Sequence, residues 1–288
     1  MGKKILVIGG DSHIATSLID VLRDRGDHVA YTSRRRDNPR ALFLDLINVA
    51  LFLESDPPSV EIVVICAAIT KFDICRNDPE TAYRINVSAP VKIAEHYLNL
   101  GARVVFLSTS AVFDGHTPFV HPTTQPNSKT EYGKLKAEAE KLLTSLDRNI
   151  AILRFSKIIV PTENIFSTWL ATLKKGKTIS AFTDQYISPL TLDHALEVLL
   201  AVINDSEDGI YQFSAKGDVN YYDIISNLVN ILGVSPNLIL EATAKEKGIP
   251  ITEIFRYNSL ESSRVEKLLG SPSPQPLAFL TEFSSRLK

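Results

Sequence analysis

The chain has few cysteines, little net charge and no long hydrophobic run, and each shortage excludes a class of protein. Its two cysteines, Cys66 and Cys75, cannot build a disulfide framework, which is typical of a reducing compartment. The net charge of −2 gives no reason to expect nucleic acid or an acidic membrane as a partner. No apolar stretch has the length of a membrane span, and the run after Lys3 and Lys4 is too short for a signal peptide. We therefore expect a soluble, cytoplasmic protein.

The chain does have enough apolar material for a large core, with 44% hydrophobic and 22% charged residues. Strand-like and helix-like segments alternate through the first 155 residues, which predicts parallel βαβ units in a doubly wound α/β sheet of the Rossmann type. We expect this domain over residues 1–155, rejoined by residues of about 183–213, and mainly a smaller C-terminal α/β lobe over 156–288. Strands are predicted over 4–8, 28–32, 61–65, 102–107 and 150–154, and helices over 14–25, 81–98, 130–146 and 277–286. Residues 184–189 are predicted to form a turn.

A glycine turn follows the first predicted strand. From Gly9 to Ala15 the spacing matches G-x-x-G-x-x-G/A, with Ser12 at the second glycine position. Such a turn lets a diphosphate approach the backbone, and the helix that begins near His13 and Ile14 would offer amide donors. An ordinary strand-to-helix turn is the alternative, but the first βα junction is the usual place of a dinucleotide site.

The second predicted strand ends in Ser33 and an arginine run that starts at Arg34. NAD sites usually carry an acidic residue here, which binds the ribose 2′-hydroxyl, and this strand end has none. Guanidinium groups match a phosphate dianion in charge and geometry. The sequence therefore predicts NADP(H) in preference to NAD(H), with Ser33 and Arg34 at the 2′-phosphate, although a solvated basic loop remains an alternative.

Tyr132 and Lys136 lie four residues apart in a predicted helix and so share one face. A nearby cation favours the phenolate and would lower the pKa of Tyr132, which suits proton transfer near neutral pH. Thr109, after a predicted apolar strand, can hold a carbonyl oxygen against that phenol. The spacing alone also fits a half-buried tyrosine beside a solvated lysine, and only the order of the other motifs favours a catalytic pair.

The chain resembles the extended short-chain dehydrogenase/reductases, and within them the dTDP-4-dehydrorhamnose reductases, nearly from end to end. The segments that carry the resemblance are the glycine turn, Asp45-Leu46, Ala67-Ala68, Asn86-Val87, Ser108 to Gly115, Tyr132 to Lys136, Leu153-Arg154, Asp184 to Pro189, and Leu260 to Arg264. The resemblance implies that Asp45 and Leu46 contact the adenine, and that Ala67 and Ala68 line the nicotinamide side. Ser110 departs from the family, which has an aspartate there. Ser110 and Ala111 also lack the acid that the related 4,6-dehydratases need, so dehydration is not expected.

By resemblance, the expected reaction is NADPH-dependent reduction of a nucleotide-linked 4-keto-6-deoxysugar. Tyr132 would donate the proton, Lys136 would bind the nicotinamide ribose, and Thr109 would bond the carbonyl oxygen. The expected substrate contacts, each of which can also be a surface or interface residue, are Ser110, Arg154, Gln185, Ser188 and Arg256. His116 and His121 lack the spacing of a zinc pair and are interpreted as structural or solvated.

Two other functions remain open at this point. One is a non-catalytic NADP-binding regulatory subunit, because the β subunit of methionine adenosyltransferase resembles the same reductases. The other is an NAD-dependent nucleotide-sugar epimerase, which would retain its cofactor through turnover. The sequence also leaves open whether the chain forms a homodimer.

Overall fold

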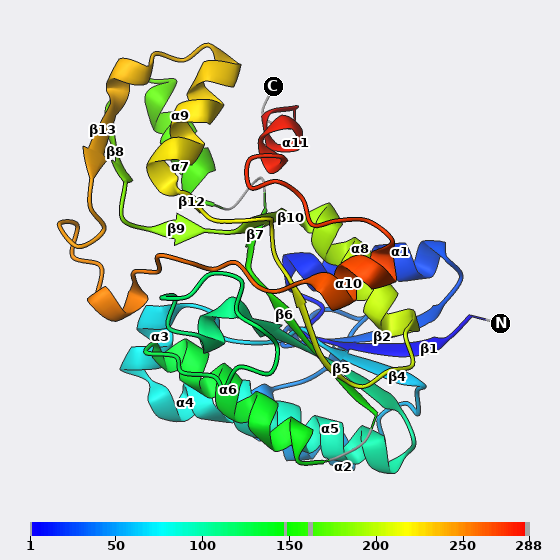
Figure 1. Ribbon diagram of the computed structural model, residues 1–288. Coiled ribbons are helices and arrows are strands. Elements are labelled where there is room, and N and C mark those ends of the chain that lie inside the picture. Colours follow the sequence, from blue (N-terminus) through cyan, green and yellow to red (C-terminus); the bar gives the residue numbers. More distant parts are fainter. Residues whose placement is uncertain (1, 147–148, 161–163, 286–288) are drawn as a thin grey trace. The chain divides into compact units, whose positions relative to one another are not determined.

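The computed structural model describes residues 2–146, 149–160 and 164–285 (Figure 1). The chain divides into two compact units. The first comprises residues 1–112, 126–154 and 196–211, and the second comprises residues 113–125, 155–195 and 212–288.

A seven-stranded sheet forms the centre of the first unit, in the order β11-β6-β5-β4-β1-β2-β3. Its strands are β1 (Lys4–Ile8), β2 (His28–Ser33), β3 (Leu42–Phe43), β4 (Ile62–Ile65), β5 (Arg103–Thr109), β6 (Ile150–Phe155) and β11 (Gly209–Phe213). β1 pairs in parallel with both β2 and β4, β2 with β3, and β4 with β5. The strand order reverses between β1 and β4, and ligands of doubly wound sheets bind outside the carboxyl ends at such a reversal. The predicted Rossmann-type fold is confirmed.

Helices cover the two faces of this sheet, with α1 on one face and α2, α5 and α6 on the other (Figure 1). The helical segments of the first unit are α1 (His13–Asp24), η1 (Leu46–Asn48), α2 (Val49–Glu54), α3 (Phe72–Asn77), α4 (Pro79–Tyr83), the π-helical turn η2 (Arg84–Ser88), α5 (Ala89–Asn99), η3 (Ser110–Val112), α6 (Glu131–Thr144) and most of α8 (Leu192–Asn204).

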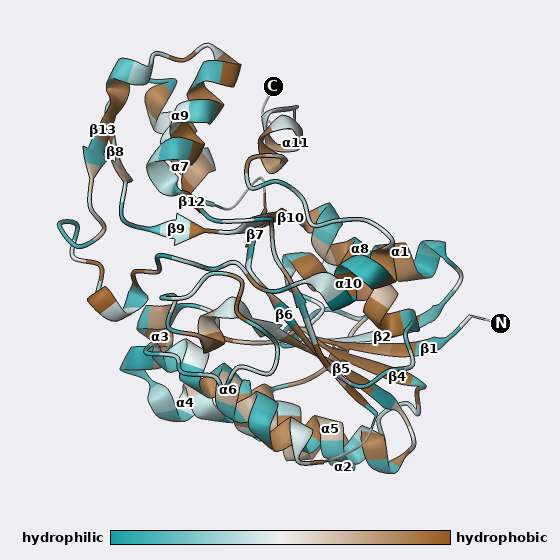
Figure 2. Ribbon diagram, viewed as in Figure 1, coloured by the Kyte–Doolittle hydropathy of each residue, from teal (hydrophilic) through white to brown (hydrophobic). Residues whose placement is uncertain are grey.

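The core of the first unit is built around the apolar residues of its central strands. All four residues of β4 are buried, as expected for a strand covered on both faces. Phe106 of β5 packs in one cluster with Ile93 and Tyr97 of α5 and Leu143 of α6. Figure 2 shows the same contrast, with hydrophobic strands at the centre and hydrophilic residues on the outer faces of the helices.

In its described part, the second unit combines three two-stranded sheets with four helices. Parallel pairs join β7 (Lys157–Ile159) to β10 (Pro189–Thr191) and β8 (Ile179–Phe182) to β13 (Ile239–Ala242), and an antiparallel pair joins β9 (Tyr186–Ile187) to β12 (Val219–Asn220). Its helices are α7 (Ile165–Leu173), α9 (Tyr221–Leu232), α10 (Ser263–Leu269) and α11 (Phe279–Ser285), with the short turns η4 (Pro236–Leu238) and η5 (Ile251–Glu253). Phe166, Trp169 and Tyr221 meet in an aromatic cluster that ties α7 to α9.

Some local predictions were wrong. The predicted turn at 184–189 contains β9 and the start of β10, because each of these strands pairs with a partner about 30 residues away, which the local pattern cannot reveal. The helix predicted over 81–98 is interrupted by the π-helical turn at Arg84–Ser88. The last predicted helix begins at Phe279, and its predicted end at residue 286 lies outside the described residues.

Candidate functional site

The glycine turn has the shape of a phosphate-binding turn. Gly9 has φ +88°, a conformation that favours glycine, and a Cβ added there would lie 2.6 Å from the Cβ of Ala67. A larger residue at this position would therefore clash with the segment that follows β4. Ser12 caps α1, since its Oγ accepts a hydrogen bond from the amide of Ala15 at 3.2 Å. His13 is exposed and Ile14 is half-buried at the start of the same helix.

The end of β2 carries an acid that the sequence pattern did not predict there. The Ser33 hydroxyl, predicted to face a 2′-phosphate, lies 2.9 Å from both carboxylate oxygens of Asp11. The amide of Arg34 lies 3.3 Å from Asp11 Oδ2, and the Arg34 side chain is exposed. Asp11 belongs to the glycine turn after β1, so only the pairing of β1 with β2 brings it to this strand end. The acid could have been predicted only from the expected parallel pairing of the first two strands, which places the turn after β1 next to the end of β2.

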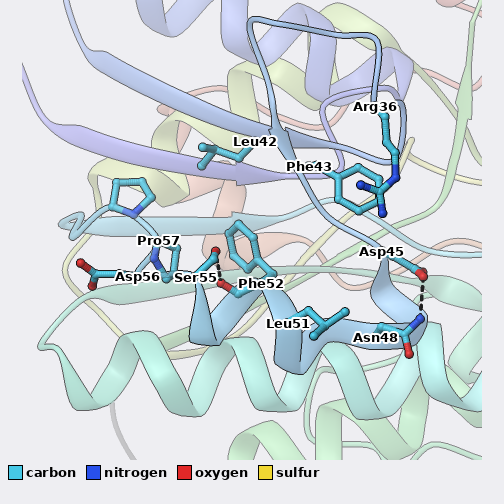
Figure 3. Close-up of a pocket in the computed structure, with 11 residues that line it drawn as sticks. Arg36, Leu42, Phe43, Asp45, Asn48, Leu51, Phe52, Ser55, Asp56 and Pro57 are labelled. Atoms are coloured by element: carbon cyan, nitrogen blue, oxygen red, sulfur yellow. Dashed lines mark hydrogen bonds between the residues drawn. The ribbon is translucent and has the colours of Figure 1, made fainter.

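Asp45 and Leu46, the predicted adenine contacts, lie where β3 leads into η1. The Asp45 carboxylate caps this turn by accepting from the Ile47 amide at 2.9 Å and from the Asn48 side chain at 2.8 Å. Asp45 also lines a cavity of about 500 Å³ between β3 and α2, drawn in Figure 3. Arg36 covers one side of that cavity, with its guanidinium 3.8 Å from the centre of the Phe43 ring.

The catalytic residues predicted from the sequence meet at the carboxyl end of β5. The phenol of Tyr132, at the start of α6, is hydrogen-bonded to the hydroxyl of Thr109. Thr130 caps α6 by accepting from the Gly133 amide at 3.0 Å, which fixes where the helix begins. One turn further on, Lys136 Nζ donates to the Leu107 carbonyl at 2.5 Å. Thr109, Tyr132 and Lys136 therefore surround one strand end.

Burial controls the pKa values at this site. Burial raises the pKa of Tyr132 and the neighbouring charge of Cys75 adds to this, while the Thr109 hydrogen bond opposes them. Burial lowers the pKa of Lys136 to about 7, against the raising effects of Glu140 and Cys66. The lowered Tyr132 pKa expected from the sequence is therefore not found in the protein alone. Desolvation is the largest effect on the phenol here.

A buried ion pair lies beside Lys136. Arg154, predicted to contact substrate, is only 1% exposed, and its Nη2 lies 2.6 Å from Glu140 Oε2. Its Nε lies 3.0 and 3.1 Å from the two Glu140 oxygens. The Ser108 hydroxyl donates to the same carboxylate. Sequence reasoning did not single out Glu140, although it follows Lys136 by one helical turn, and Arg154 presents almost no surface to a ligand.

The remaining residues near this site occupy the ends of β4 and β5. Ala67 and Ala68 follow β4 and are half-buried, and Ser110 begins η3 with 8% exposure. Asn86, inside the π-helical turn, exchanges two hydrogen bonds with the backbone of Ile69, at 2.8 and 2.9 Å. Asn86 thereby fixes the segment that follows β4, along which Ala67 and Ala68 are placed.

In the second unit, the predicted substrate residues mostly hold the backbone. The Gln185 side chain accepts from the Phe255 amide at 2.9 Å and donates to the Glu253 carbonyl at 3.2 Å. Ser188 is fully buried and donates to the Ala215 carbonyl at 3.1 Å. Arg256 is exposed, with its guanidinium 5.8 Å from the centre of the Tyr257 ring. Arg256 is therefore the one of these three residues whose side chain is exposed and could reach a ligand.

Within the described ranges, no cluster of three or more His, Cys, Asp or Glu side chains is placed to hold a metal ion. His116 and His121 are both exposed, and His121 Nδ1 lies 2.8 Å from the Thr123 hydroxyl. Over the same residues, none of the helices combines the length and the hydropathy that a membrane span requires.

Comparison with known proteins gives the chain a family. Residues 3–286 match the family described as RmlD substrate binding domain. The chain is 26% identical, over 93% of each protein, to a probable low-salt glycan biosynthesis reductase, Agl14, of Haloferax volcanii. It is 28% identical to methionine adenosyltransferase 2 subunit beta of Xenopus tropicalis, over 95% of this chain and 85% of that protein.

Among solved structures, dTDP-4-dehydrorhamnose reductase of Bacillus anthracis in complex with NADP superimposes with a TM-score of 0.85, at 21% identity, over 99% of both chains. This likeness establishes the fold, and the family match extends over almost the whole sequence. The chain therefore belongs to the RmlD substrate-binding domain family, within the NAD(P)-dependent oxidoreductases of the extended short-chain dehydrogenase/reductase type.

Proposed function

We propose that this protein uses NADPH to reduce the keto group of a nucleotide-linked 4-keto-6-deoxysugar. The observation that carries the proposal is the hydrogen bond between Tyr132 and Thr109 at the carboxyl end of β5, with Lys136 one helical turn away. The Tyr132 phenol and the Thr109 hydroxyl meet at this strand end, so both can bind the same carbonyl oxygen. The similarity to a probable glycan biosynthesis reductase and to a dTDP-4-dehydrorhamnose reductase supports a sugar-nucleotide substrate.

The residues around the glycine turn fit a dinucleotide. Gly9 lets the turn pack closely against Ala67, and α1 is a 12-residue helix whose N-terminus follows at once. Such a helix end attracts a diphosphate through its amide groups and its dipole. The exposed guanidinium of Arg34 supports a preference for NADP(H) over NAD(H), because it can pair with a 2′-phosphate. Bound NADPH would supply the hydride.

The protein's own residues then handle the carbonyl oxygen. Thr109 donates a hydrogen bond to this oxygen and holds it against the Tyr132 phenol. Tyr132 gives its proton to the oxygen as negative charge develops there, and its raised pKa keeps that proton in place until then. Lys136 binds the ribose next to the nicotinamide, and its protonated form favours the phenolate that remains on Tyr132.

The test is an absorbance assay with NADPH and a 4-keto nucleotide sugar. Tyr132→Phe should lower turnover by roughly 10²–10⁴-fold, the usual contribution of general acid catalysis, while NADPH still binds. Tyr83→Phe is the matched control, because Tyr83 is an exposed tyrosine of α4 in the same unit. Unchanged NADPH oxidation by Tyr132→Phe would show that the phenol is not the proton donor.

A non-catalytic regulatory subunit is the second candidate. The similarity to a methionine adenosyltransferase subunit over 95% of this chain favours it. In that case the protein would bind NADPH, yet no 4-keto nucleotide sugar would be reduced, and Tyr132→Phe would change nothing that the assay measures.

A further inference from the structure

We infer that Asp11 weakens the preference of this protein for NADP(H) over NAD(H), by offering a carboxylate to the 2′ position of the adenosine ribose. The inference rests on the proposed use of a nicotinamide dinucleotide and adds a specificity-determining residue to it. Asp11 would accept a hydrogen bond from the ribose hydroxyl of NAD(H) and would repel the 2′-phosphate of NADP(H). Its effect would then oppose that of Arg34.

The position of Asp11 is the first argument. In doubly wound folds the group that selects between the two cofactors lies at the carboxyl end of the second strand. Here that strand ends at Ser33, which is 2% exposed and whose hydroxyl donates a hydrogen bond to Asp11. Two bonds between the glycine turn and Thr32, from the amide of Gly9 to the side chain and from the amide of Gly10 to the carbonyl, hold the two strand ends together. The carboxylate missing from the end of β2 is thus supplied by the turn after β1.

The free hydrogen-bonding capacity of Asp11 is the second argument. A carboxylate has about four acceptor positions, and the bonds from the Ser33 hydroxyl and the Arg34 amide use only part of them. The side chain of Asp11 is exposed, so the other positions face solvent. The two bonds restrain the carboxylate, which reduces the conformational freedom that it would lose on binding a ribose hydroxyl.

The charge balance is the third argument. A 2′-phosphate at this strand end would lie close to the anion of Asp11 as well as to the cation of Arg34. Near a protein surface, repulsion between charges a few ångströms apart is enough to change an affinity by roughly tenfold. The arginine run by itself would therefore overstate the preference for NADPH.

The test measures the binding of four ligands to Asp11→Asn, namely NADPH, NADH and the adenosine fragments 2′,5′-ADP and 5′-AMP. Asparagine keeps the size of the side chain and a carbonyl that can accept from Ser33, but it removes the charge. The ratio of NADPH to NADH affinity should rise by about tenfold, and the fragment ratio should rise with it, because both ratios report the same 2′ position. The increase should shrink at high salt, where exposed charges are screened.

Asp20→Asn is the matched control, since Asp20 is an exposed residue of α1 and its loss changes the net charge equally. This variant should leave both ratios unchanged. Asp11→Ser is a second probe in case asparagine perturbs the turn, and it should shift the ratios in the same direction. Thermal melting establishes that each variant is folded.

The outcomes separate the two proposals. If the unaltered protein binds neither dinucleotide, the proposed function fails and the role of Asp11 fails with it. If both dinucleotides bind and neither Asp11 variant changes the ratios, the role of Asp11 alone is refuted. A shift of equal size in Asp20→Asn would also refute it, because the effect would then come from the net charge of the protein.

Discussion

Removing the charge of Glu140 should destabilise the protein far more than a typical surface change. Glu140 and Arg154 are almost completely buried, with their closest atoms 2.6 Å apart. Glu140→Gln would remove the buried carboxylate that pairs with the Arg154 guanidinium, in a medium that solvates the guanidinium poorly. Breaking such a pair costs about 3–5 kcal/mol, a large part of the roughly 5–15 kcal/mol that usually holds a protein folded. Urea denaturation followed by circular dichroism at pH 7 measures this loss.

The chain contains a matched control for burial. Lys134 and Glu131, on the same helix, also lie 2.6 Å apart, but their side chains are 53% and 42% exposed. Glu131→Gln should cost less than about 1 kcal/mol, because water solvates each partner alone.

A double variant tests whether the cost comes from the buried guanidinium that Glu140→Gln leaves behind. Glu140→Gln combined with Arg154→Met should cost less than Glu140→Gln alone, since the buried guanidinium is removed together with its carboxylate partner. A loss for Glu140→Gln as small as that for Glu131→Gln would refute the argument. It would mean that water or another group compensates the buried arginine.

Two further predictions concern the glycine turn and Lys136. Gly9→Ala should lower both the melting temperature and the affinity for NADPH, because the added Cβ clashes with Ala67. Gly26 is the control, since it has a similar φ of +84° but no atom near an added Cβ. Gly26→Ala should therefore show only the backbone strain of about 1–2 kcal/mol. Equal effects of the two substitutions would show that the close packing of Gly9 against Ala67 is not the cause. Lys136 has a pKa of about 7 in the folded protein, against an ordinary lysine pKa of 10.5. Between these two values the unfolded chain binds the extra proton, so stability should rise with pH across this window. Urea midpoints at pH 7 and 9 should show Lys136→Met losing up to roughly 2–3 kcal/mol of that rise, and an unchanged pH dependence would refute the low pKa.

The strands and long helices of the first unit were predictable because burial requires apolar residues at regular positions in the sequence. β1 has the predicted bounds, and α1 and α6 begin within one residue of theirs. β3, α2 and α3 were not predicted, since each is six residues or shorter and depends on packing against other elements. The same reason applies to β9 and β10, which exist only through their distant partners.

The sequence by itself determined the alternation of strands and helices, the glycine turn, and a tyrosine and a lysine on one helix face, because each of these is a local pattern. Tertiary structure alone decided which charges meet. It paired Arg154 with Glu140, brought Asp11 to the end of β2, and raised the pKa of Tyr132 where a neighbouring amine alone would lower it. The physical reason is that solvation and electrostatic interaction depend on distance in space and on burial, and neither quantity is set by separation along the chain.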